Sequence, residues 1–97
     1  MTHEELLIQL EELADRLNIE IRYESGKGED PATFGGYCRI GGRHIIVAHS
    51  KASLRRKIDL FTAALGHFDI DDLYLKPALR DHLKNSREKA IDLFQGM

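Results

Sequence analysis

Side chains that could bind a metal are spread over the middle of the chain. The candidates are one cysteine, several histidines and a run of aspartates: Cys38, His44, His49, His67, Asp69, Asp71 and Asp72. Cysteine and histidine suit zinc, but Cys38 and His44 fall on opposite faces of an expected hairpin. His49 and His67 could converge if the following helix packs back along that hairpin. We expect no native metal site and no cofactor, and we keep Cys38, His49 and His67 as candidate residues of a cleft.

Cys38 is also the residue that could act as a nucleophile. Arg39 follows it and glycines precede it, a setting that could leave a thiolate accessible and electropositive. A base would have to come from His44 or His49. An unpaired cysteine is more often a small buried residue than a reactive one, so we expect Cys38 to be inert. Because no complete set of acid, base and nucleophile is found, we expect a protein that is not an enzyme.

The basic residues are concentrated in one part of the chain. Residues 1–30 hold nine acids and three bases, whereas residues 31–58 hold six bases and no acid. A segment with a net charge of +6 could attract an anionic partner, including the phosphates of a nucleic acid. Alternatively, it faces the acidic first helix, within the monomer or across a dimer, which we favour. The six bases are Arg39, Arg43, Lys51, Arg55, Arg56 and Lys57.

The segment Phe61–His67 reads Phe-Thr-Ala-Ala-Leu-Gly-His. It resembles the active-site helix of the minimal zincins, small metallopeptidase-like domains found in bacterial regulators. In the H-E-x-x-H motif, two histidines on one helix face hold zinc and the glutamate acts as the base. Ala63 and Ala64 replace the first histidine and the glutamate, so the resemblance implies a catalytically inactive relative. The alternative is an ordinary helix end, with Gly66 as a cap and His67 near the helix C-terminus.

The elements that would position these residues begin with a helix and a strand. Residues 3–18 carry leucines at helical spacing, and Thr2 and Glu5 form the S/T-x-x-E capping box that starts a helix. Residues 19–24 alternate apolar and charged side chains, which indicates a half-buried strand. A glycine-containing loop over residues 25–31 follows, without the spacing of a phosphate-binding loop.

A β-hairpin is expected over residues 34–40 and 43–49. Its turn is Gly41–Gly42, since glycine supplies the positive φ angles that a type I′ turn requires. This register places Cys38 opposite Ile45. We expect their face of the hairpin to be the core face, because its other members are mostly apolar.

Two further helices complete the chain. Residues 51–65 carry an apolar stripe, and Ser50 is the expected N-cap. Pro77 fits the first turn of a third helix, which could break at Asn85–Ser86. Residues 84–97 could project as a helical tail.

Together these elements predict a single small α+β domain over residues 1–97. The order is α-β-β-β-α-α, with a three-stranded sheet packed against two helices and an additional C-terminal helix. No apolar run approaches the ~18 residues of a membrane span, and one cysteine without a targeting signal favours the cytoplasm. We expect a non-enzymatic interaction or accessory module whose partner is a protein or a second copy of the chain. The alternatives are an anion- or nucleic-acid-binding module using residues 39–57, and an inactive zincin-like domain.

Overall fold

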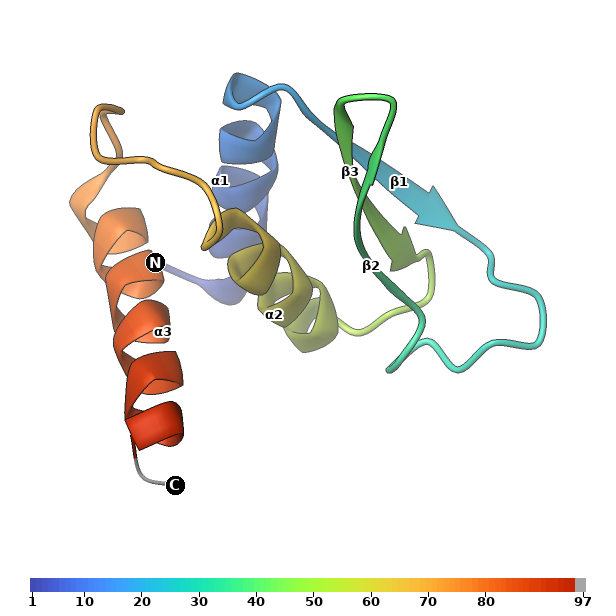
Figure 1. Cartoon of the computed structure of the whole chain (residues 1–97). Coiled ribbons are helices and arrows are strands. Elements are labelled where there is room, and N and C mark those ends of the chain that lie inside the picture. Colours follow the sequence, from blue (N-terminus) through green and yellow to red (C-terminus); the bar gives the residue numbers. More distant parts are fainter. Residues whose placement is uncertain (96–97) are drawn as a thin grey trace.

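Three helices and three strands follow one another in the expected order α-β-β-β-α-α (Figure 1). The computed structural model describes the backbone of residues 1–95 and the side chains of residues 1–87. The elements are α1 (His3–Arg16), β1 (Ile19–Glu24), β2 (Gly35–Ile40), β3 (Arg43–His49), α2 (Leu54–Leu65) and α3 (Pro77–Gln95). This arrangement confirms the predicted α+β fold. Among the described residues, no helix is long and apolar enough to cross a membrane.

The strands form one open sheet in the order β1-β3-β2. The central strand β3 runs parallel to β1 and antiparallel to β2, which leaves β1 and β2 at the two edges. Gly41 and Gly42 have φ angles of 56° and 82°, as a type I′ turn requires. The predicted hairpin register is confirmed, with Cys38 opposite Ile45.

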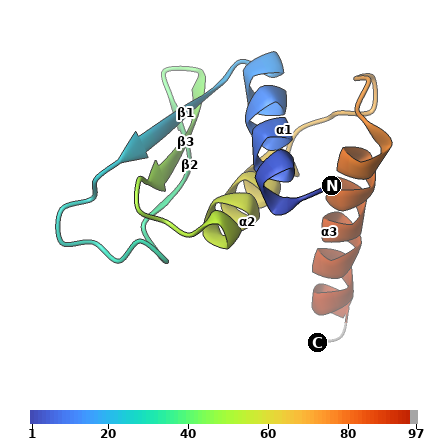
Figure 2. The same cartoon turned by 180° about the vertical axis from the view of Figure 1, so that it is seen from behind.

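Both α1 and α2 lie on the same side of the sheet, and α3 lies beyond them (Figures 1 and 2). We call the face of the sheet that is turned toward the helices the inner face and the opposite face the outer face. The core lies between the inner face and the two helices. Its fully buried side chains include Leu10, Leu13, Ile46, Phe61 and Leu65.

The predicted core face of the hairpin is wrong. Ile46 and Ala48 belong to the cluster of core residues, whereas Cys38 and Ile45 lie on the outer face. The reason is that β3 carries apolar residues on both of its faces, so its own alternation does not identify the buried one. The choice is made by β1, whose Ile21 pairs with Ile46 and packs against the core.

Charged side chains surround Ile45 on the outer face. Glu20 is the cross-strand partner of Ile45 and accepts hydrogen bonds from the guanidinium groups of Arg22 and Arg43. The apolar stems of such long side chains can cover hydrophobic surface. Ile45 is 2% exposed although it lies on the face turned away from the helices, whereas Ile40 on the same face is 59% exposed.

The two later helices differ from their predicted forms. α2 begins at Leu54, because the Ser53 hydroxyl accepts a hydrogen bond from the Arg56 N–H at 3.0 Å. Ser50, the predicted N-cap, instead donates its own N–H to the Glu24 carbonyl at 2.8 Å. α3 continues through Asn85–Ser86 without the predicted break. The predicted projecting tail comprises residues 84–97, and most of its side chains lie outside the described residues.

Candidate functional site

Two basic residues of the 39–57 segment, Arg39 and Arg43, belong to the sheet, and they lie on its opposite faces. Arg39 alternates with Cys38 along β2 and therefore lies on the inner face, where it is exposed. Arg43 lies on the outer face and forms an ion pair with Glu20. Among the described residues, Arg39 forms no ion pair, so it is a free cation at the rim of the inner face. Within the same part of the chain, Lys51, Arg56 and Lys57 form no ion pair either.

The bases of α2 have separate contacts within the molecule. Arg55 forms an ion pair with Asp59 one turn along the helix, at 3.4 Å. Arg56 donates to the Phe34 carbonyl oxygen at 3.4 Å. The bases of α2 and those of the sheet therefore point in several directions. The six bases do not make one continuous basic patch.

Tyr23 connects the basic segment with the acidic first helix. Its hydroxyl donates to Glu11 of α1 at 2.8 Å, and the ammonium of Lys57 lies 5.3 Å from the centre of its ring. Burial raises the pKa of Tyr23, and the hydrogen bond to the Glu11 carboxylate and its negative charge raise the pKa further. Among the described residues, no ion pair joins α1 directly to the basic segment.

The three candidate cleft residues are not brought together. Cys38 is half-buried on the outer face. His49 is 3% exposed, and its Nδ1 accepts the Lys51 N–H at 3.0 Å. His67 is exposed beyond the other end of α2, and a helix of 12 residues spans about 18 Å. The prediction that His49 and His67 could converge is therefore wrong. The described residues contain no group of three or more ligating side chains that could hold a metal ion.

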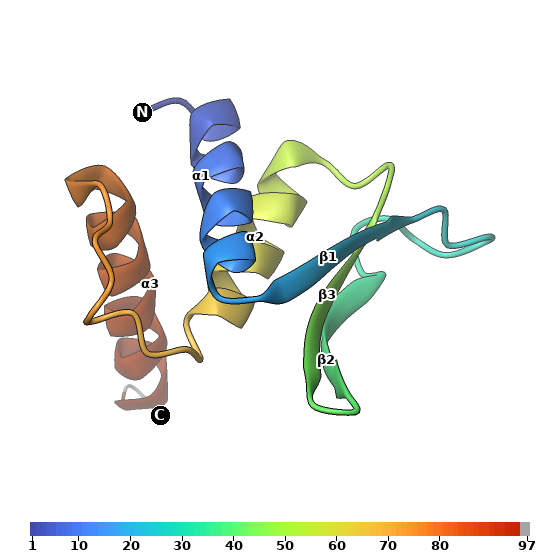
Figure 3. The same cartoon turned by 90° about the horizontal axis from the view of Figure 1, so that it is seen from above.

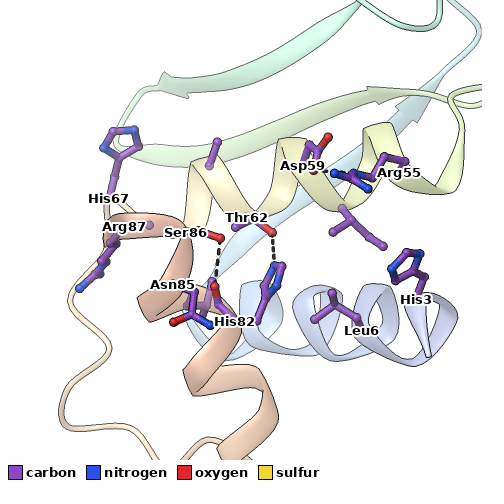
Figure 4. Close-up of a pocket in the computed structure, with 14 residues that line it drawn as sticks. His3, Leu6, Arg55, Asp59, Thr62, His67, His82, Asn85, Ser86 and Arg87 are labelled. Carbon is purple, nitrogen blue, oxygen red and sulfur yellow. Dashed lines mark hydrogen bonds and ion pairs between the residues drawn. The ribbon is translucent and has the colours of Figure 1, made fainter. Parts of the chain in front are cut away.

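A groove of about 780 Å³ runs along α2, between the start of α1 and the described part of α3 (Figure 4). Leu6, Ile58 and Leu83 provide apolar walls. A hydrogen bond of 2.9 Å between the Thr62 hydroxyl and Nε2 of His82 crosses from α2 to α3. The groove is thus an opening between three helices.

The position of His67 bears on the zincin resemblance. His67 lies at one end of the groove, away from His3 and Arg55 at the other end (Figure 4). A zincin-like cleft is expected to face the edge of the sheet. The lining residues instead come from α1, α2, the chain just after α2, and α3. Gly66 has a φ angle of −64°, so it ends the helix without a left-handed cap.

β2 forms one of the two edges of the sheet, and β1 forms the other (Figure 3). In a hairpin with a two-residue turn, the pair that closes the turn exchanges both hydrogen bonds, and such pairs then alternate along the strands. Ile40 and Cys38 therefore direct their backbone groups toward β3, whereas Tyr37 and Arg39 direct theirs outward. We call these outward N–H and C=O groups the β2 edge. No turn, loop or cap hydrogen bond of the described residues uses them.

An aromatic cluster supports the β2 edge on the inner face. The Tyr37 ring stacks on His44 with an interplanar angle of 17°, and their side chains share a hydrogen bond. Phe68, just after α2, packs edge-on against both rings, with centroids 6.0 Å and 5.0 Å away. Tyr37 is nevertheless 39% exposed, so this edge combines a fixed aromatic ring with an accessible backbone.

The sequence did not predict that Tyr37 and Ile40 lie exposed on an edge strand of the sheet. The Gly41–Gly42 turn was sufficient to show which backbone groups of the hairpin point outward. Whether those groups meet another strand depends on the order β1-β3-β2, which no local pattern specifies.

Compared with known proteins, the chain matches no family model, no curated protein sequence and no solved structure. Its function is therefore inferred from its own geometry and chemistry.

Proposed function

We propose that the chain is a small non-enzymatic interaction module of the cytoplasm that docks a protein partner along the β2 edge. The observation that carries this proposal is the accessible backbone of Tyr37 and Arg39, flanked on the outer face by Ile40 at 59% exposure. An extended segment that adds a strand to such an edge gains main-chain hydrogen bonds along its length.

The composition of β2 supports the same proposal. Proteins commonly protect an edge strand with proline, lysine, an inward-pointing charge or a covering loop. The strand Gly35–Ile40 contains neither proline nor lysine, and its one charged residue, Arg39, is exposed. Arg39 is thus the one protecting charge on β2, so the edge favours a partner that neutralises this charge.

The two alternative functions have weaker support. A nucleic-acid-binding surface would gather its bases along one face, whereas Arg39 and Arg43 lie on opposite faces of the sheet. An inactive zincin-like domain is supported by the place of His67 at one end of the groove, but the walls of that groove come from helices.

The proposal is tested by affinity capture from native cell extract with the wild-type chain and the Arg39→Pro variant. Proline removes the outward N–H of residue 39 and is tolerated on edge strands, because no ladder bond is lost there. We expect a nuclease-resistant protein partner that Arg39→Pro loses. Arg55→Ala, which removes an exposed charge of the basic segment away from β2, is the matched control and should retain the partner.

Two results would contradict the proposal. Capture that is equal for wild type and Arg39→Pro would place the docking surface elsewhere. Capture of cargo that nuclease releases would favour the nucleic-acid alternative, and it would then require Arg39, Arg43, Arg55 and Arg56 to be replaced in turn.

A further inference from the structure

We infer that the partner of the β2 edge is an extended segment in which acidic and apolar side chains alternate. This inference rests on the proposed function and adds the chemistry of the segment. Side chains of a strand point alternately to the two faces of a sheet. A strand added beside β2 therefore places every second side chain on the inner face and the others on the outer face.

Acidic side chains fit the inner face of the added strand. There the neighbours on β2 are Tyr37 and Arg39, and Arg39 is exposed and has no ion pair among the described residues. A carboxylate on the adjoining strand can reach the guanidinium and accept charge-assisted hydrogen bonds, which are the stronger kind.

Apolar side chains fit the outer face. There the neighbours on β2 are Ile40, which is largely exposed, and the half-buried Cys38. Gly36, on the same face, leaves open space, since a methyl group added to it would meet nothing within 4 Å. An aliphatic side chain of the added strand can fill this space and cover Ile40, and burial of apolar area favours binding.

A second copy of the chain fits the same edge less well. Antiparallel pairing of two β2 strands would bring two Arg39 side chains to the same face of the joined sheet. Since β2 has no acidic residue, neither guanidinium would gain a partner of opposite charge. Charge complementarity therefore favours the acidic segment.

The test uses a fluorescent peptide of about eight residues, slightly longer than an average strand, that alternates glutamate and valine. Its binding to the full chain is measured by fluorescence anisotropy beside a peptide with lysine in place of glutamate. We expect the glutamate peptide to bind at least about tenfold more tightly, and Arg39→Pro to weaken its binding by a similar factor. The charge reversal Arg39→Glu should invert the preference, so that the lysine peptide binds better.

Circular dichroism establishes that both variants fold, and Arg39→Glu leaves every backbone N–H in place should Arg39→Pro not fold. Equal affinity for the two peptides, no binding of either to the wild type, or no inversion with Arg39→Glu would overturn the inference. So would a wild-type dimer in light scattering that Arg39→Pro dissociates, because a second copy would then occupy the edge. If the peptide fails while Arg39→Pro still loses a captured protein, the proposed function stands and only the acidic segment is rejected.

Discussion

Tyr23 joins three elements of the molecule through one side chain. Its ring packs against Phe61 of α2 at a centroid distance of 6.3 Å, and its hydroxyl reaches Glu11 of α1. Lys57 lies over the same ring. A residue that the alternation of β1 marks only as half-buried thus holds the strand to both helices.

The Tyr23→Phe variant should lose about 1 kcal/mol at neutral pH, the usual contribution of one hydrogen bond. Folding raises the pKa of Tyr23 above its ordinary value of 10.0, so the folded chain holds this proton more tightly than the unfolded chain does. The stability that the Tyr23 hydroxyl contributes to the folded chain is complete below pH 10. It is lost as the pH rises through the pKa of Tyr23 in the folded chain. Urea unfolding at several alkaline pH values should therefore show a shallower loss of stability for Tyr23→Phe. An identical slope in both proteins would contradict this assignment.

Gly35 occupies a position that no other residue fits. Its φ angle is 101°, and a methyl group there would lie 2.2 Å from the Val47 carbonyl oxygen. Gly35→Ala should lower the free energy of unfolding by about 3 kcal/mol, through backbone strain and the clash together. Gly28 has a φ angle of 76° with open space around it, so Gly28→Ala should show only the strain, about 1 kcal/mol. Thermal unfolding of both variants checks this difference, and equal losses would show that the close approach to Val47 is unimportant.

At the scale of elements, local signals were sufficient wherever the structure uses local contacts. The capping box of Thr2 and Glu5 begins α1 as predicted, because both hydrogen bonds lie within one turn. The Gly41–Gly42 turn sets the hairpin register for the same reason. The buried face of β3 was predicted wrongly, because it is selected by pairing with β1, as between Ile21 and Ile46, which are far apart in the sequence.

The start of α2 was also decided by a distant contact. Two serines three residues apart could each cap this helix, and the backbone of Ser50 is held instead by the Glu24 carbonyl at the end of β1. In the candidate site, the predicted hairpin register already puts Arg39 and Arg43 on opposite faces, but which face turns toward the helices could not be read from the sequence. Arg39 and Arg43 end on opposite faces because strand alternation separates them.

Replacement of the two serines distinguishes the caps. Ser53→Ala removes the acceptor of the Arg56 N–H and should cost about 1 kcal/mol of stability. Ser50→Ala leaves a backbone hydrogen bond untouched and should change stability by less than about 0.5 kcal/mol. Chemical denaturation of the two variants measures both effects. A larger loss for Ser50→Ala than for Ser53→Ala would move the start of α2 back to its predicted place.

At the scale of the whole molecule, the helices cover one face of the sheet, and β1 and β2 stand at its two edges. α1 and α2 pack on the core residues of the inner face, and the outer face carries the ion pairs around Glu20. The β2 edge has neither kind of cover among the described residues. A fold of this size therefore combines a buried core with the unpaired β2 edge, on which the proposed docking function rests.

Backbone amide exchange by NMR tests this account most directly. In the chain alone, the outward N–H groups of Tyr37 and Arg39 should exchange quickly with solvent, and those of Cys38 and Ile40 slowly, because these two bond to β3. Saturation with the glutamate–valine peptide should slow exchange at Tyr37 and Arg39 by at least about tenfold. Slow exchange at both residues without any partner, or protection that appears along the α2 groove instead of the β2 edge, would contradict the account.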